Sequence, residues 1–222
     1  MDPEFQPAGT GIETHGPQVK RAESSSLAEP SIPAVLSIPT EPFFLFVGKL
    51  SRRRNLPLLL EAFRQLKERT KLPHRLVIVG PDTSGANVVD RAVAMSIGGS
   101  VDYRKYASKA ELIELYQAAA AFVLPTLHEG FSFTTLEAMA CGAPVIVFDH
   151  LALEGGVRQA AFVVEEATAG SLREALQAVA EGASLSEKLR RAGLDCAAGF
   201  SWRKTAGETA AALVSCQSPE RK

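Results

Sequence analysis

Cysteine is scarce in this sequence, and long apolar runs are missing. The three cysteines among 222 residues are an odd number without a Cys-x-x-Cys spacing, which argues against a disulfide framework and a structural zinc site. Such sparse cysteine fits a reducing compartment. No apolar stretch approaches the roughly 20 residues of a membrane-spanning helix, since the longest, at 118–125, ends in proline.

An excess of one charge is also missing. The 24 basic and 25 acidic residues leave a formal net charge of −1, so no global field attracts nucleic acid or an anionic membrane. The composition, with 46% hydrophobic and 22% charged residues, is that of an ordinary globular protein. It excludes the collagen-like and fully disordered classes.

The first 42 residues differ from the remainder. They hold seven of the 13 prolines, a serine run at 24–26 and one aromatic residue, Phe5. Such a segment cannot bury enough apolar surface to offset its ordering entropy, so we expect a flexible leader over 1–42. Residues 1–5 resemble translated cloning sites and are interpreted as an expression scar. No cationic stretch precedes an apolar core, so a signal peptide is not expected.

From residue 43 onward, short apolar runs alternate with stretches of helical period. The predicted strands are 43–48, 75–80, 100–103, 121–125, 144–148 and 161–164. The predicted helices are 56–69, 87–96, 109–118, 135–141, 171–181, 185–197 and 201–214. The first of these helices has one apolar face, formed by Leu59, Leu60, Phe63 and Leu66.

Strands that are apolar throughout, each followed by a helix, are typical of a parallel sheet covered on both faces. The sequence therefore predicts one doubly wound, Rossmann-like α/β domain with a six-stranded parallel sheet over 43–215, and a disordered tail at 216–222. Ligands of such folds bind at the carboxyl ends of the strands, near a topological switch point. A site is therefore expected among the loops at 48–55, 80–85 and 126–135.

The stretch at 121–149 carries the strongest local signals. A buried strand ends at Pro125, a polar loop follows, and a short helix opens near Thr134. Gly142 suits the left-handed C′ position of that helix, and Pro144 cannot prolong it. The start of the helix then faces the carboxyl edge of the sheet, where unpaired amides and the helix dipole suit a diphosphate.

Two glutamates eight residues apart, Glu129 and Glu137, bracket this loop. With EGF at 129–131, LEAM at 136–139 and GAPV at 142–145, they resemble the E-x7-E signature of family 4 retaining glycosyltransferases of the GT-B fold. Further similar segments are FVGKL at 46–50, LLLEAF at 58–63, LVIVG at 76–80, EL at 111–112, LY at 115–116 and FSW at 200–202. The resemblance extends over about 43–213, in the order of the family.

The resemblance implies a site for the nucleotide-sugar donor. It assigns the ribose hydroxyls to Glu137, hydroxyls of the donor sugar to Glu129, and the diphosphate to Lys49 and Arg54 beside Gly48. The sugar and phosphates would also meet the loop and the helix start, at Gly130, Phe131, Ser132, Phe133, Thr134, Thr135 and Leu136. The base is expected near Gly80, Pro81, Tyr106 and Ala107.

The residue types fit these roles on chemical grounds as well. A carboxylate only accepts hydrogen bonds and suits vicinal sugar hydroxyls, which donate them. The leaving diphosphate gains charge as the glycosidic bond breaks, so cations and amides already in place stabilise the transition state more than the ground state. The sequence contains no Asp-x-Asp. We therefore expect no metal ion, and no cofactor beside the nucleotide-sugar substrate.

Four positions near the expected donor site depart from the family's pattern. Lys49 stands where arginine is usual, and Arg54-Asn55 stand where Lys-Gly is usual. The charge is kept, but the geometry is not. Lys105 replaces a frequent glycine, which weakens the assignment of the base contacts.

Simpler interpretations compete with each assignment. Glu137 follows Thr134 by three residues and can complete a capping box. Glu129 can be an exposed loop acid, and the arginines at 52–54 can form a solvated basic turn. We expect two of these arginines to be solvated and Arg54 to meet phosphate.

Other conspicuous side chains receive structural roles. The rings of Phe131 and Phe133 are expected to pack the loop onto the sheet, and Trp202 to dock the last helix. His128 is expected to be a loop residue without a catalytic part, and His150 is left unassigned.

The sequence thus predicts the C-terminal, donor-binding half of a retaining hexosyltransferase of carbohydrate biosynthesis. Its partner would be an N-terminal Rossmann-like domain of the same polypeptide, and the isolated chain would bind a UDP or GDP sugar without transferring it. A sugar-nucleotide epimerase, a glycogen-type phosphorylase and a non-catalytic nucleotide-binding or interaction module remain alternatives. We expect a cytoplasmic protein without a nucleic-acid partner. Peripheral association with the inner face of the membrane stays open.

Overall fold

The computed structural model describes residues 38–83, 87–149 and 156–216. Its six strands are β1 (Phe43–Val47), β2 (Arg75–Val79), β3 (Val101–Arg104), β4 (Ala121–Leu124), β5 (Val145–Phe148) and β6 (Phe162–Val164). They form one parallel sheet in the order β3-β2-β1-β4-β5-β6. The prediction of a doubly wound, six-stranded parallel fold is therefore confirmed.

Helices connect the successive strands, and three more follow the last strand. They are α1 (Leu56–Arg69), α2 (Val88–Ala94), α3 (Lys109–Ala118), α4 (Phe133–Ala140), α5 (Val157–Ala160), α6 (Ala169–Glu181), α7 (Ala183–Ala198) and α8 (Trp202–Cys216). Two short 3-10 turns, η1 (Arg52–Arg54) and η2 (Gly98–Ser100), and the short helix α5 were not predicted. Every predicted strand and helix has a counterpart whose ends lie within two residues of the predicted ones.

Part of the predicted domain organisation lies outside the described residues. Most of the leader at 1–42, the tail from residue 217 onward, and His150 belong to this part of the chain. The boundaries of the leader and the tail therefore stay predictions.

The first helix shows how the sequence sets its own packing. The four residues of its apolar face are fully buried. Asn55, at φ 51°, separates η1 from α1, and asparagine is among the few residues that adopt this left-handed conformation readily. Pro57 lies in the first turn, where its missing N–H costs no intrahelical bond.

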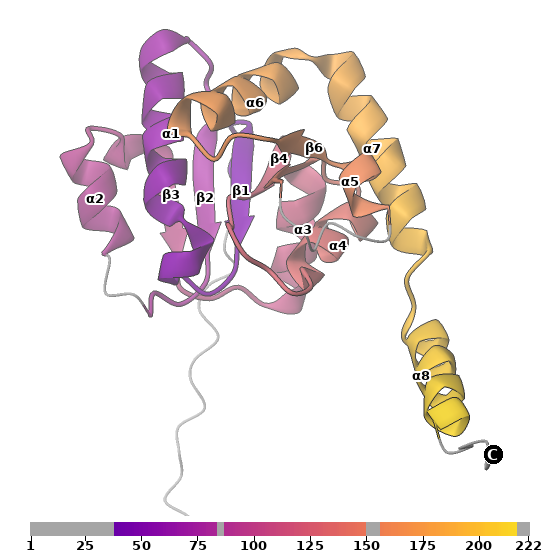
Figure 1. Cartoon of the computed structure of the whole chain (residues 1–222). Coiled ribbons are helices and arrows are strands. Elements are labelled where there is room, and N and C mark those ends of the chain that lie inside the picture. Colours follow the sequence, from indigo (N-terminus) through magenta and orange to yellow (C-terminus); the bar gives the residue numbers. More distant parts are fainter. Residues whose placement is uncertain (1–37, 84–86, 150–155, 217–222) are drawn as a thin grey trace, which may run out of the picture. The chain divides into compact units, whose positions relative to one another are not determined.

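The sheet forms the core, and helices cover both of its faces. Every residue of β1, β4 and β5 is buried. Helices α1 and α6 pack together in front of the sheet in Figure 1, and α3 and α4 pack together behind it. The strand order reverses between β1 and β4, so the loops after these two strands meet at the switch point of the sheet.

Two glycines let the loops after β1 and β2 approach each other. Gly48 and Gly80 have φ values of 147° and 139°, which side chains rarely tolerate. A Cβ atom on Gly80 would lie only 2.1 Å from the carbonyl oxygen of Gly48. The Gly48 amide also donates to the carbonyl of Val79 at 2.9 Å, which continues the β1–β2 pairing into the loop.

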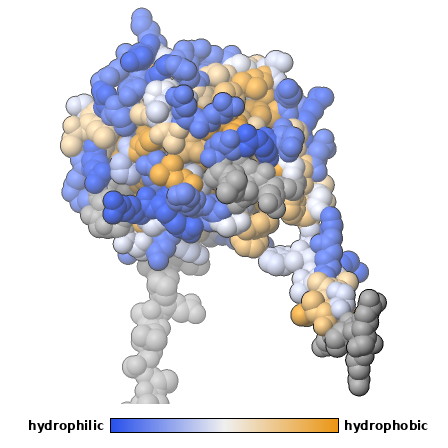
Figure 2. Space-filling model, in the orientation of Figure 1, coloured by the Kyte–Doolittle hydropathy of each residue, from blue (hydrophilic) through white to orange (hydrophobic). Residues whose placement is uncertain are grey.

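The face drawn in Figure 2 is mostly hydrophilic, with hydrophobic residues appearing between the polar ones. Within the described ranges, every helix is too short or too polar to cross a lipid bilayer.

Candidate functional site

The loops after β1 and β4 are tied to each other at the switch point. Thr126 is fully buried, and its hydroxyl lies 3.1 Å from the carbonyl oxygen of Arg53, to which it donates. The amide of Leu127 donates to the same carbonyl at 3.4 Å. This junction joins the basic turn η1 to the loop that carries Glu129.

Glu129 forms an ion-pair cluster with the two arginines that end η1. Its Oε2 lies 2.6 Å from Nη1 of Arg54, and its Oε1 accepts from Nη1 of Arg53 at 3.1 Å. The Glu129 side chain is only 7% exposed and that of Arg54 13%, whereas that of Arg53 is 54% exposed. The interpretation of Glu129 as an exposed loop acid is therefore wrong. Arg53 is exposed as expected, but it also contacts this carboxylate.

The Arg54–Glu129 pair is covered on most of its surface. Nη1 of Arg54 and Oε2 of Glu129 are each other's nearest charged partner, at 2.6 Å. Burial lowers the pKa of the Arg54 guanidinium, and the neighbouring Glu129 carboxylate opposes that effect. The pair therefore holds a positive and a negative group side by side at the end of β1, where a ligand with phosphates and hydroxyls could meet both.

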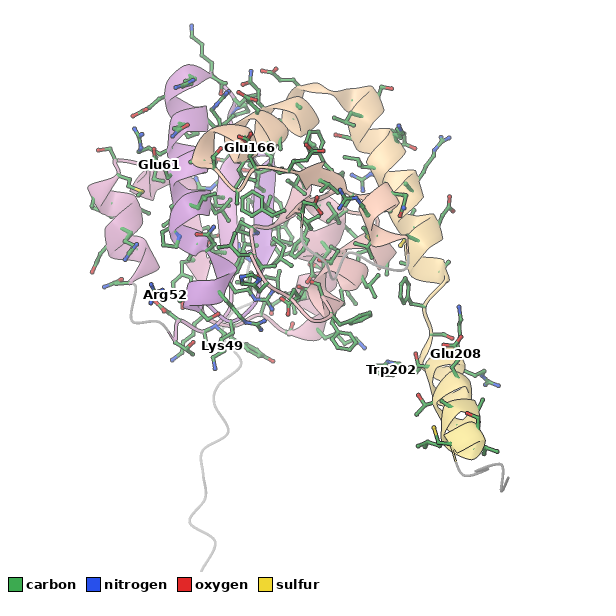
Figure 3. The ribbon with its side chains drawn as sticks, viewed as in Figure 1. Lys49, Arg52, Glu61, Glu166, Trp202 and Glu208 are labelled. Atoms are coloured by element: carbon green, nitrogen blue, oxygen red, sulfur yellow. The ribbon has the colours of Figure 1, made fainter. Side chains whose placement is uncertain are left out.

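The other basic residues lie at the same edge of the sheet. Figure 3 shows Lys49 and Arg52 at the lower end of the ribbon, toward which β1 and β2 point. Lys49 is exposed. The guanidinium of Arg54 lies over Gly48, where an added Cβ would be 3.8 Å from its Cζ. Positive charge therefore gathers where β1 ends.

Helix α4 begins earlier than predicted. Its N-cap is Ser132, whose Oγ accepts from the amide of Thr135 at 3.3 Å. The capping-box interpretation of Thr134 and Glu137 is therefore wrong, because the helix has already started at Phe133. Gly142 takes the left-handed conformation predicted for it, with φ 77°.

Glu137 lies one turn into α4 and is exposed. Its Oε2 accepts a hydrogen bond from the phenol of Tyr116 on α3, at 3.4 Å. Tyr116 is 2% exposed, and burial, followed by the nearby Glu137 carboxylate, raises the pKa of its phenol. The sequence did not indicate a functional role for Tyr116. The signal that could have indicated one is a phenol among the buried residues of α3, where its hydroxyl needs a partner.

Phe131 and Phe133 do not pack onto the sheet as predicted. They are 48% and 54% exposed and contact each other, with ring centroids 4.8 Å apart. Phe131 also contacts Phe200, and Phe133 stacks on Trp202, which is itself 75% exposed. Since Ser132 has an extended conformation and turns inward to cap α4, its two neighbours point the other way.

The residues expected near the base lie after β2, which neighbours β1, and after β3, at the edge of the sheet. Gly80 and Ala107 are buried, whereas Pro81 and Tyr106 are exposed. The carbonyl of Pro81 accepts from the amide of Leu50 at 2.9 Å, so this loop is linked to the loop after β1. Their role in binding a base stays a prediction. In the described part of the chain, no three His, Cys, Asp or Glu side chains gather as a metal-binding group would.

Comparisons with known proteins point to one family. Residues 29–195 match the family model described as glycosyl transferases group 1. The chain is 29% identical over 171 residues to the O-antigen chain mannosyltransferase B of Escherichia coli, which covers 75% of this chain and 44% of that protein. It is 32% identical over 179 residues to a D-inositol 3-phosphate glycosyltransferase of Frankia alni, an alignment that covers 73% of this chain and 42% of that protein. The chain therefore spans less than half the length of these relatives.

Solved structures show the same fold. A sucrose-phosphate synthase from Thermosynechococcus elongatus aligns with a TM-score of 0.68 and 25% identity, over 81% of this chain and 47% of that one. The C-terminal domain of the Francisella tularensis group 1 protein LpcC aligns with a TM-score of 0.62 and 18% identity. This alignment covers 72% of the present chain and 85% of that domain. Because the family model matches more than half of the chain, the protein belongs to the group 1 glycosyl transferases, and its sheet is a Rossmann-like half of the GT-B fold.

Proposed function

We propose that this chain is the donor-binding domain of a retaining glycosyltransferase, which transfers a sugar from a nucleoside diphosphate sugar to an acceptor. One observation carries the proposal. The basic loop after β1 and the loop after β4 that leads into α4 meet at the switch point of the sheet, and they contribute Arg54 and Glu129 to one ion pair. Positive charge, free amides and carboxylates at one edge suit a ligand with both phosphates and hydroxyls.

The diphosphate is assigned to Lys49, Arg54 and the first turn of α4. Arginine binds phosphate through a planar fork of donors, and lysine acts as a point charge. At the start of α4, the amide of Thr135 is capped by Ser132, which leaves the amides of Phe133 and Thr134 at the positive end of the helix dipole. These groups supply the positive charge, so we propose that binding needs no metal ion and no additional cofactor.

The hydroxyls of the donor are assigned to two glutamates, Glu137 and Glu129. Glu137 is exposed one turn into α4 and would accept from the ribose. Glu129 lies beside Arg54 and would accept from the transferred sugar, next to the leaving phosphate. A hydrogen bond to a charged group contributes about 1.5–3 kcal/mol net.

The chemistry of transfer follows from where charge develops. As the glycosidic bond breaks, the leaving diphosphate gains negative charge, and Arg54 already lies in a poorly solvated position beside it in this proposal. A cation held in place stabilises the developing charge without reorganising at the moment of reaction. The pairing with Glu129 fixes the position of the guanidinium, whose remaining N–H groups would face the phosphate.

The acceptor site is assigned to a further domain. The chain spans 44% of the E. coli mannosyltransferase and 42% of the Frankia glycosyltransferase, which leaves room in such proteins for a second Rossmann-like half. The name of the E. coli relative, a mannosyltransferase, supports a hexosyl donor. We propose that the isolated chain binds the donor, that transfer requires the additional domain, and that the enzyme acts in the cytoplasm.

Calorimetric titration of the 222-residue chain with UDP, GDP and ADP tests the binding step. We expect one of the three to bind, and Glu137→Ala to weaken that binding by about 10–100-fold, the equivalent of about one charged hydrogen bond. Glu114→Ala, at an exposed glutamate of α3, is the matched control and should bind like the wild type. The absence of heat with all three nucleotides, or an unchanged affinity of Glu137→Ala, would overturn the proposal.

A further inference from the structure

The carboxylate of Glu137 accepts a hydrogen bond from a buried side chain, Tyr116. Tyr116 comes from α3, which packs against α4. Its ring meets the ring of Phe122 edge-on, with centroids 5.7 Å apart, and the residue is 2% exposed. Because the ring is enclosed, its phenol has a fixed position, 3.4 Å from Oε2 of Glu137.

The direction of this hydrogen bond is settled by chemistry. An ionised carboxylate only accepts hydrogen bonds, so the phenol must donate its proton to Oε2. Burial favours the protonated phenol, which therefore remains a donor. The Cys141 thiol at the end of α4 also interacts with this pair; burial, and then the Glu137 carboxylate, raise its pKa, so it too stays neutral.

Without the phenol, Glu137 would be an exposed side chain free to adopt several rotamers. Ordering a glutamate side chain costs free energy of the same order as one hydrogen bond. An anchor on Oε2 removes much of that cost before a ligand arrives, and it leaves Oε1 of this exposed residue as a second acceptor. Preorganisation of this kind raises affinity without adding a contact to the ligand.

We propose that Tyr116 is a positioning residue, whose phenol holds Glu137 so that its free oxygen meets the 2′- and 3′-hydroxyls of a ribonucleoside diphosphate. The inference rests on the proposed function, because it concerns the same binding site. Tyr116 touches no ligand in this account and acts only through Glu137.

The competing explanation reverses the dependence. A buried tyrosine needs a partner for its hydroxyl, and Glu137 could serve only to satisfy it. In that case, removal of the phenol oxygen changes the stability of the fold but leaves recognition of the ribose unchanged. The two explanations therefore differ in one measurable quantity, which is the preference for a ribose with hydroxyls over one without them.

The test compares a nucleoside diphosphate with its 2′,3′-dideoxy counterpart, for the base that the 222-residue chain binds best. We expect the wild type to prefer the ribonucleotide, and Tyr116→Phe to reduce this preference by about 3–10-fold, as for the loss of one ordinary hydrogen bond. The affinity for the dideoxy nucleotide should stay unchanged. Tyr116→Phe keeps the ring that packs on Phe122, and circular dichroism verifies that the variant is folded.

Two controls isolate the route through Glu137. Tyr103→Phe removes a phenol oxygen from β3 and should keep the wild-type preference. In a Glu137→Ala background, Tyr116→Phe should cause no further loss, because the group through which it acts is gone. Glu137→Gln is a further variant at this exposed position. Its side-chain amide has one acceptor oxygen where the carboxylate has two, so its preference for the ribonucleotide over the dideoxy nucleotide should also fall.

The possible results distinguish a failure of the positioning role of Tyr116 from a failure of the proposed donor-binding function. If the wild type prefers the ribonucleotide and Glu137→Ala abolishes that preference while Tyr116→Phe preserves it, the positioning role is overturned and the proposed function stands. If the wild type binds no nucleotide, or does not distinguish the two sugars, the role of Glu137 is wrong and the inference falls with it.

Discussion

Charged residues of the site are paired with one another inside the protein. Glu129 and Arg54 are almost completely covered, while Lys49 is left exposed. In such a covered pair, each charge depends on the other for compensation, since neither is well solvated. The removal of one partner therefore costs more than the pair itself contributes to stability.

Glu129→Ala should lower the free energy of unfolding by about 2–4 kcal/mol, because it leaves Arg54 covered without a counter-charge. Glu68→Ala is the matched control. It breaks an ion pair with Arg64 in which the glutamate is 57% exposed, and should cost about 0.5 kcal/mol or less. Urea unfolding measures both. Equal losses in the two variants would show that the cluster around Glu129 is solvated.

His74 makes the stability depend on pH. Its ring is 6% exposed and stacks on Phe44 at 5.0 Å, and its Nδ1 has no hydrogen-bond partner among the described residues. Burial, and then the charge of Lys67, lower the pKa of the imidazole. Below about pH 6.5 the unfolded chain binds a proton that the folded protein resists, so the folded state loses stability as the pH falls.

His74→Phe keeps an aromatic ring against Phe44 and removes the titration. Between about pH 7.5 and about pH 5.5, the free energy of unfolding should fall less in this variant than in the wild type. His128→Gln, at an exposed loop histidine, should retain the wild-type slope. Urea denaturation at several pH values gives the slopes. A wild-type slope in His74→Phe would place the pH dependence elsewhere.

Single residues of the site were easier to predict than their contacts. The sequence singled out Glu129 and Arg54 separately, because their residue types suit hydroxyls and phosphates. Their pairing could not be predicted, since 75 positions separate them and the contact depends on β1 and β4 being neighbours. The same holds for Tyr116 and Glu137, which meet only because α3 packs against α4.

At the scale of elements, the loops after β1 and β2 are locked by a close approach of backbone to backbone. Gly80→Ala would place a Cβ atom 2.1 Å from the Gly48 carbonyl and force a left-handed φ on alanine. We expect it to lower the free energy of unfolding by about 2–4 kcal/mol. Gly99→Ala is the control, since an added Cβ there meets nothing within 4 Å. Thermal unfolding compares them, and a tolerated Gly80→Ala would mean that the loops separate easily.

Elements were predicted best where one signal dominated. The bounds of α1 and α3 were predicted correctly. Helix α1 has a fully buried apolar face, and α3 begins with a capping box formed by Ser108 and Glu111. The start of α4 was misplaced because Ser132 and Thr134 can both cap a helix. Only packing of the loop selects Ser132, and this choice also turns Phe131 and Phe133 outward.

On the scale of the whole molecule, the two last helices differ in how they are supported. Helix α7 buries Leu189 and Gly193, and a Cβ on Gly193 would lie 3.2 Å from Met139 of α4. Helix α8 has no buried residue, and the stack of Trp202 on Phe133 is mostly exposed. An isolated helix of this length is marginally stable in water, so α8 should add little to the stability of the domain.

A chain ending at Ser201 should therefore unfold with nearly the free energy of the full chain, losing about 1 kcal/mol at most from the exposed ring stack. A chain ending at Gly182 also lacks α7 and uncovers Met139, so it should lose at least about 3 kcal/mol. Urea unfolding followed by far-ultraviolet circular dichroism measures both. If the first truncation costs as much as the second, α8 supports the domain through contacts beyond this ring stack. Helix α8 would then have to be counted among the elements that hold Phe133 and the start of α4 in place.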